Sequence, residues 1–178
     1  KVRIVAEDEQ ACIEIKTDEE FVTLNVRDFG AKGDGITDDT LFIQSAIMAC
    51  PKKGRVLIPE GTYKVTSLFL KDDLNLELAQ GAVLSAETDR RKFPIYPGLD
   101  ETEEYNLGTW EGNPLPMFSA IITGVNVKHV VIYGKGVIDG NANFDEDNWW
   151  YQPKVKRIAF RPRMLFLNHC EDVVVAGI

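Results

Sequence analysis

Two pairs of adjacent carboxylates, Asp38 with Asp39 and Asp72 with Asp73, are the first residues whose type suits acid–base chemistry. Cleavage of a sugar linkage needs two carboxyl groups that face each other across the sugar. Neighbours in one turn of the chain do not have that arrangement. We therefore interpret Asp38 and Asp39 as carboxylates favoured by the dipole of a helix N-terminus, and Asp72 and Asp73 as a solvated turn.

Other reactive residue types are also poorly spaced for catalysis or metal binding. The glycine-rich stretch 30–35 matches neither GxGxxG nor GxxxxGK[ST], and the ligand spacing after Asp34 does not fit an EF-hand. His129 and His169 have no Ser, Cys or Asp at triad spacing, so we interpret both as structural. We expect no metal and no cofactor. The cysteines form no CxxC pair and are interpreted as buried thiols, although one disulfide plus a free thiol also fits: Cys12, Cys50 and Cys170.

A basic segment contrasts with the formal net charge of −8. It contains five cations and no acid: Lys154, Lys156, Arg157, Arg161 and Arg163. Because guanidinium groups pair bidentately with carboxylates, the segment suits an acidic polysaccharide, and a solvated or fold-stabilising basic face is the alternative. The overall negative charge argues against nucleic acid. The sequence also has no apolar run long enough to predict a membrane-spanning helix.

The stretch 26–51 predicts a tight turn followed by one helix. Residues 28–35 are rich in glycine and aspartate, as expected of a turn that needs positive φ angles. Thr37 is the expected N-cap, and Pro51 is expected to end the helix. The apolar face at helical spacing is predicted to contain Phe42, Ile43, Ala46, Ile47, Ala49 and Cys50.

After this helix, short strands rich in Val, Ile and Leu recur, each bounded by Gly, Pro or Asp. Two pairs of segments align: KHVVIYG (128–134) with EDVVVAG (171–177), and LAQGAVL (78–84) with YGKGVID (133–139). Such recurrence predicts the stacked coils of a solenoid over residues 24–178. Residues 1–23 form a lead-in with two short strands, and the insertion 92–117 is a candidate functional loop.

Four motifs in this order resemble glycoside hydrolase family 28, the polygalacturonases: DFGAKGDGITDDT with FIQSAI, GRVLIPEGTYKV, GKGVIDGNANFDEDNWW and RPRMLFLNHCEDVVVAGI. The resemblance covers about residues 24–178. It implies an all-β fold, a right-handed parallel β-helix whose N-terminal end is capped by the helix. It also implies a pectin-degrading hydrolase that cleaves α-1,4-galacturonosyl linkages of polygalacturonate with inversion. The location implied is secreted or periplasmic, or cytoplasmic if oligogalacturonides are the substrate.

The same resemblance suggests residues that contact substrate. Trp110 and Glu111 lie in a Trp-Glu-Gly turn similar to one in the exo-acting branch, where loops over the N-terminal coils close one end of the cleft. Two further tryptophans match the family's paired-tryptophan position, and such rings stack on sugars, although core packing is the alternative. The candidate substrate-binding residues are therefore Trp110, Glu111, Trp149, Trp150, Arg161 and Arg163.

The family's catalytic motifs are expected after the segment 161–170, and none of them follows it in this sequence. They are an Asn-Thr-Asp motif, an Asp-Asp pair, a Gly-His-Gly motif and an Arg-Ile-Lys motif. We therefore expect this chain to be the N-terminal part of a longer protein, with catalytic carboxylates downstream of Ile178, and to be inactive alone. The alternatives are a non-catalytic β-helix carbohydrate-binding or tailspike-like module, and a calcium-dependent pectate lyase or epimerase on the same fold.

Overall fold

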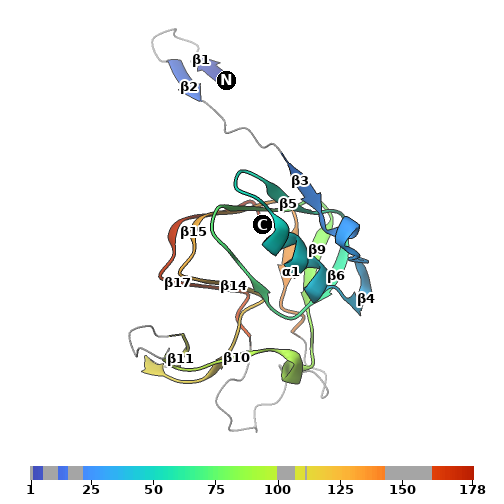
Figure 1. Ribbon diagram of the computed structural model, residues 1–178, viewed down its shortest axis with the longest axis vertical. Helices are drawn as coiled ribbons and strands as arrows, with labels where there is room; N and C mark the ends of the chain where they lie inside the picture. The colour runs from blue at the N-terminus through green and yellow to red at the C-terminus, as the bar shows by residue number, and fades with distance from the viewer. Residues whose placement is uncertain (1, 6–11, 16–21, 100–106, 111, 143–161) are drawn as a thin grey trace.

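The computed structural model describes residues 2–5, 12–15, 22–99, 107–110, 112–142 and 162–178 (Figure 1). Its main body is a right-handed parallel β-helix with three sheets, and the three middle coils each contribute one strand to every sheet. The strands of one sheet come from successive coils and pair in parallel. This confirms the solenoid that the recurring short strands predict.

The five-stranded sheet has the strand order β18-β15-β8-β5-β3. Its strands are β3 (Thr23–Asn25), β5 (Arg55–Ile58), β8 (Leu74–Leu78), β15 (Lys128–Gly134) and β18 (Glu171–Ala176). The four-stranded sheet, in the order β16-β9-β6-β4, contains β4 (Asp34–Asp38), β6 (Gly61–Val65), β9 (Ala82–Ala86) and β16 (Val137–Asp139). The three-stranded sheet, in the order β17-β14-β7, contains β7 (Leu68–Phe69), β14 (Ile122–Val125) and β17 (Leu165–Asn168).

The core lies inside the coils, where side chains of the same register stack from coil to coil. On the five-stranded sheet, Val56, Leu76 and Ile132 are paired neighbours, and all three are fully buried. Residues between them along each strand point outward and stay partly exposed. Alternation thus places one apolar row inside and one mixed row outside, as expected when a strand covers a core on one face.

One of the two predicted segment alignments has the observed register, and the other is wrong by one residue at each end. Lys128 pairs with Glu171 and Val130 with Val173, as KHVVIYG against EDVVVAG predicts. For the second pair, the structure places Gly134 beside Leu78 and Val137 beside Val83. The turn between the two strands is therefore shorter in the later coil, which an ungapped alignment misses.

The cap helix α1 (Thr40–Ala49) begins two residues later than predicted, because Thr37 lies in β4 and the N-cap is Asp39. Asp39 occupies the N-cap position, but its buried carboxylate accepts hydrogen bonds from the backbone N–H groups of Lys32 and Gly33, at 2.7 and 2.9 Å. Asp38 instead accepts from the Thr40 backbone N–H at 3.0 Å. The role of Asp39 is therefore to close the glycine-rich turn.

The other end of α1 agrees with the sequence. The helix ends before Cys50 and Pro51, and its buried side chains are Ile43, Ala46 and Ile47. Cys50 is buried beside them and Phe42 packs partly against the core, whereas Ala49 is exposed, contrary to the prediction. The 3₁₀ helix η1 (Val26–Phe29) precedes the glycine-rich turn and buries Val26.

Asp72 and Asp73 lie in a turn, as predicted, with Asp72 exposed, and both also connect neighbouring coils. Asp73 pairs with Lys52 at 2.8 Å and lies 3.3 Å from His129, while Asp72 accepts from the Lys128 backbone N–H. Four residues at equivalent positions of successive coils have positive φ angles between 53° and 61°: Lys53, Asp73, His129 and Asp172. The chain therefore bends in the same left-handed way each time it enters the five-stranded sheet.

The N-terminal lead-in contains the two predicted strands. β1 (Val2–Val5) and β2 (Cys12–Ile15) pair antiparallel, with Val2 opposite Ile15 and Ile4 opposite Ile13. Figure 1 draws this hairpin apart from the three sheets. Within the described residues, no helix is long and apolar enough to cross a membrane.

Gly134 is the position where the coils tolerate no side chain. Its φ is +131°, and an added Cβ would lie 1.9 Å from the backbone oxygen of Leu78 in the neighbouring strand. We expect Gly134→Ala to lower the free energy of unfolding by about 3 kcal/mol or more, because backbone must move in a paired strand.

Gly112→Ala is the matched control for this variant. Gly112 also has a positive φ, +83°, but an added Cβ would have nothing within 4 Å. This change should cost only about 1 kcal/mol, from the left-handed backbone alone. Equal denaturation midpoints for the two variants in urea would contradict the close packing of β8 against β15.

Candidate functional site

Both long connections of the solenoid leave it at the same corner, between the four-stranded and three-stranded sheets. Residues 87–121 join β9 to β14, and residues 140–164 join β16 to β17. In the preceding coil, only Thr66 and Ser67 join β6 to β7. Because β9 neighbours β16 and β14 neighbours β17, the two insertions emerge one above the other. We call this place the loop corner; β10 and β11 project from it in Figure 1.

The described part of the first insertion has its own small structure. It contains η2 (Arg90–Lys92), β10 (Ile95–Tyr96), β11 (Thr109–Trp110), β12 (Asn113–Pro114) and β13 (Met117–Phe118). β10 pairs with β13, and β11 with β12, both antiparallel. The prediction that this segment interrupts the coils is confirmed.

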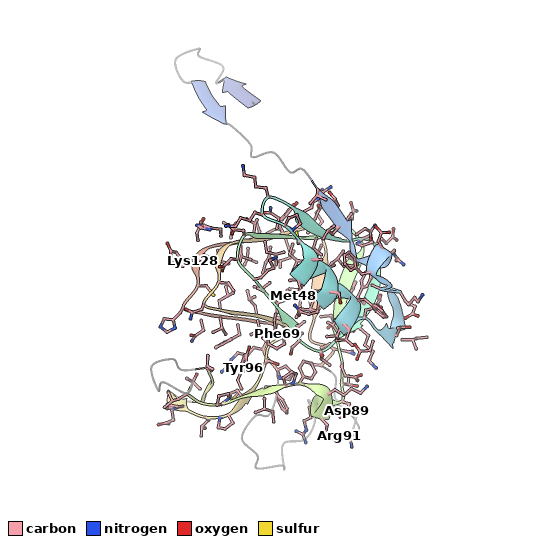
Figure 2. The ribbon with its side chains drawn as sticks, viewed as in Figure 1. Met48, Phe69, Asp89, Arg91, Tyr96 and Lys128 are labelled. Carbon is pink, nitrogen blue, oxygen red and sulfur yellow. The ribbon has the colours of Figure 1, made fainter. Side chains whose placement is uncertain are left out.

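Aromatic contacts hold the insertion against the solenoid. The rings of Phe69, from β7, and Tyr96, from β10, meet edge to face with centroids 6.1 Å apart. Figure 2 labels both residues, one in the coil and one in the insertion. Within the insertion itself, Phe93 and Phe118 form a second edge-to-face contact at 6.3 Å, and both are buried. The insertion is thus packed on the corner by geometry that aromatic pairs favour.

Glu87 fixes the start of the insertion. Its side chain is buried, with lysines from two segments on one carboxylate oxygen: Lys64 Nζ is 3.0 Å and Lys92 Nζ 2.6 Å from Oε2. Oε1 accepts the backbone N–H of Asp89 at 3.0 Å. Burial alone would raise the pKa of Glu87, but the hydrogen bonds from Lys92, Asp89 and Lys64 outweigh it and lower the pKa to about 2.

The root of the insertion gathers positive charge on an acidic chain. η2 consists of Arg90, Arg91 and Lys92. Lys92 and Lys64 share the carboxylate of Glu87 as their partner. Arg91 forms a double hydrogen bond with Asp89, at 2.7 and 2.8 Å, and both residues are labelled in Figure 2. Four cations thus lie close together at the root of the insertion, with Glu87 and Asp89 among their carboxylate partners.

The outer face of the four-stranded sheet presents a polar row next to the loop corner. Lys64 is paired with Asp38 on one side and with Ser85 on the other, and Ser85 is paired with Asp139. None of these four residues is buried. Asp139 accepts the backbone N–H of Asn141 at 2.8 Å, and the side chain of Asn141 donates to the Ala86 backbone oxygen at 3.1 Å. A hydroxyl, a carboxylate and an ammonium group thus lie side by side across adjacent strands.

The predicted substrate-binding residues are placed only in part. Arg163 is half-buried; its Nη2 donates to the backbone oxygen of Thr109 at 2.9 Å, and its Cζ lies 5.9 Å from the Phe166 ring. The guanidinium therefore links β17 to β11, which contains Trp110. Glu111, Trp149, Trp150 and Arg161 lie outside the described residues, as does the Trp110 side chain. Substrate binding by all six residues stays a prediction.

Sequence reasoning missed Lys64, Glu87 and Asp139. Lys64 and Asp139 join one row only through the strand register, which the ungapped alignment places one residue out. Glu87 follows a strand without any motif. Its only signal is a carboxylate directly before an insertion rich in Arg and Lys. Among the described residues, no group of three His, Cys, Asp or Glu side chains could hold a metal ion.

Comparison with known proteins gives matches over different parts of the chain. Residues 23–78 match the family model described as rhamnogalacturonase A/epimerase, pectate lyase-like. An exo-poly-alpha-D-galacturonosidase of Dickeya chrysanthemi is 37% identical over 122 residues, which is 66% of this chain and 19% of that protein. Plasmin and fibronectin-binding protein A of Streptococcus pneumoniae is 46% identical over 74 residues, 39% of this chain and 10% of that protein.

Among solved structures, the family 28 exopolygalacturonase of Yersinia enterocolitica matches with a TM-score of 0.75 and 25% sequence identity. The match covers 98% of this chain and 38% of that structure. This chain therefore spans about a fifth of the first relative and about two fifths of the solved structure. The likeness extends over nearly all of the coils, well beyond the region of the family model.

Glu87→Gln should destabilise the protein and change its response to acid. A carboxyl whose pKa falls from 4.5 to about 2 on folding contributes stability that is present above pH 4.5 and is lost as the pH falls towards 2. We expect the variant to lose about 2 kcal/mol at neutral pH. The wild-type and variant stabilities should then converge between pH 4.5 and 2 in urea titrations.

Glu60→Gln is the control, because Glu60 is exposed and it is its backbone oxygen that accepts the hydrogen bond from Arg27, at 2.8 Å. This variant should follow the wild-type curve closely. The unfolding free energies of the wild-type protein and the Glu87→Gln variant could instead run parallel throughout the acid range. That result would show that the two lysines do not stabilise the charged form of Glu87.

Proposed function

Because the chain resembles the exo-acting branch of glycoside hydrolase family 28, we propose that it forms the N-terminal coils of a pectin-degrading hydrolase. The reaction is cleavage of α-1,4-galacturonosyl linkages of polygalacturonate from a chain end, with inversion. The observation that carries the proposal is the loop corner, where both long connections leave coils that match a family 28 exopolygalacturonase with a TM-score of 0.75.

The substrate class follows from the charges at the loop corner. Polygalacturonate carries one carboxylate per sugar, so its binding needs cations despite a net charge of −8 on the chain. η2 and Lys64 supply such cations at the root of the first insertion. In the outer row, Ser85 lies beside Lys64 and Asp139 lies beside Ser85, and both can bond sugar hydroxyls.

Glu87, the carboxylate at the root of the first insertion, positions that insertion and is not one of the catalytic pair. An inverting hydrolase needs one protonated carboxylic acid and one carboxylate base, with space for water between them. Glu87 cannot be the acid, because two lysines hold its pKa at about 2 and its oxygens already have partners. We therefore assign Glu87 to fixing the insertion and place proton transfer on carboxylates after Ile178.

A non-catalytic binding module is the second candidate. The 46% identity to plasmin and fibronectin-binding protein A favours it. The glycine-rich turn and the cap helix can end a β-helix of any function, because a fold does not fix function. A lyase is the third, because the matching family model is described as pectate lyase-like. All three share the first coils, and the products of the reaction distinguish them.

The protein isolated from its natural source should release monogalacturonate or short oligomers from polygalacturonate. The products should lack the ultraviolet absorbance of unsaturated sugars, and NMR should show the new reducing end first as the β anomer. Residues 1–178 produced alone should release no reducing sugar. Unsaturated products would support a lyase, and binding without any product would support the module.

The first insertion should determine whether cleavage starts from a chain end. Replacing residues 93–117 by a short turn keeps Lys92 on Glu87 and opens the space above the coils. In the active protein, we expect a rapid fall in the viscosity of polygalacturonate per reducing end formed, as in internal cleavage. Lys32→Ala, at an exposed residue elsewhere, is the control. Unchanged products from a variant that still folds would contradict this role.

A further inference from the structure

A hollow lies away from the loop corner, at the turns that lead from the five-stranded sheet to the four-stranded sheet. Its volume is about 450 Å³. Pockets that bind small ligands have roughly 300–1,000 Å³, so this one can hold a sugar residue. The lining residues are Glu77, Ala79, Gln80, Tyr133, Gly134, Lys135, Ala176 and Gly177.

Close backbone packing creates the floor of this pocket. Gly134 lies beside Leu78, and a Cβ on Gly177 would lie only 2.4 Å from the backbone oxygen of Gly134. Glycine is therefore required in two successive coils at this turn, and Ala79 and Ala176 add little bulk on either side. The hollow is a consequence of how the coils stack.

One wall is a polar network on the outer face of the sheet. Glu77 Oε2 accepts from Arg55 Nη1 at 2.6 Å and from the Tyr133 hydroxyl at 3.3 Å. Arg55 also donates to the Thr23 hydroxyl at 2.9 Å. These bonds hold the Glu77 carboxylate and the Tyr133 side chain in place, as a preorganised binding site requires. A carboxylate accepts sugar hydroxyls, and an aromatic ring contacts the sugar face.

Lys135 gives the pocket its charge preference. It is exposed, lies in the turn that lines the pocket, and has no ion pair with another described residue. Glu77 is already neutralised by Arg55 at 2.6 Å. The pocket therefore has one uncompensated positive charge next to hydroxyl acceptors and an aromatic side chain.

We propose that this pocket binds one uronate residue of an acidic polysaccharide. Lys135 contacts the sugar carboxylate, Glu77 accepts its hydroxyls and Tyr133 packs against its ring. The polymer class rests on the proposed function, but the site itself lies at a different corner of the coil from the two insertions. A polysaccharide bound here is retained on the protein independently of the residues at the loop corner.

Trigalacturonate and the neutral galactotriose are the probes, with affinities measured by calorimetry and the site located by NMR. Trigalacturonate should shift the backbone amide signals of Gly134 and Gly177. Lys135→Ala should weaken this binding by about threefold to tenfold, and Lys135→Glu by more. Galactotriose should bind more weakly, with no response to either substitution. Lys32→Ala, at another exposed lysine, should leave both affinities unchanged.

Three results would overturn the assignment: unshifted signals at Gly134 and Gly177, unaltered trigalacturonate affinity in Lys135→Ala, or equal binding of the two probes. The test reads binding and not hydrolysis. Uronate binding at this pocket in a protein that cleaves nothing would support the inference while the proposed function fails. Hydrolysis of polygalacturonate with no effect of Lys135 substitution on binding would support the proposed function and overturn the inference.

Discussion

The hydrogen bonding of parallel strands in register constrains every other feature of this molecule. Successive coils must lie about 4.8 Å apart. A strand therefore cannot gain a residue or shift its register without disrupting the rows of buried apolar side chains. The row Val56, Leu76 and Ile132 shows how completely the interior is filled. Extra residues can be accommodated only at the corners. Both long connections leave the coils at the same corner, between β9 and β14 and between β16 and β17.

Charge is arranged along the coils with the same regularity. The bend that enters the five-stranded sheet contains two lysines at 52–53, two aspartates at 72–73, then Lys128 with His129, and finally Glu171 with Asp172. The sign alternates from coil to coil. Lys52 pairs with Asp73, and Lys128 with Glu171 at 2.6 Å. These exposed pairs contribute little stability individually. Like charges at the same positions would repel, so the alternation favours one stacking order.

The sequence predicts the strands and the solenoid because these depend on local patterns. Short apolar runs ended by glycine or proline mark the strands, and Pro51 marks the end of α1. The start of α1 is mispredicted because the carboxylate of Asp39 bonds to the glycine-rich turn, a contact that spacing does not show. Of the six substrate-binding residues predicted, Arg163 has a described side chain, and it bonds the backbone of the insertion. This contact joins residues 54 positions apart in the chain, so no local pattern in the sequence indicates it.

At the loop corner and at the pocket, a carboxylate is paired with a basic side chain, but the consequence differs between the two places. At Glu87, a carboxylate is neutralised by Lys64 and Lys92, buried, and thereby removed from chemistry. At Glu77, a carboxylate is neutralised by Arg55 but stays at the wall of a hollow, where it can still accept hydroxyls. The difference is the neighbouring turn, because an insertion covers the first and glycines open the second. In this molecule, what lies beside each paired carboxylate therefore decides whether it is buried, as Glu87 is, or lines a hollow, as Glu77 does.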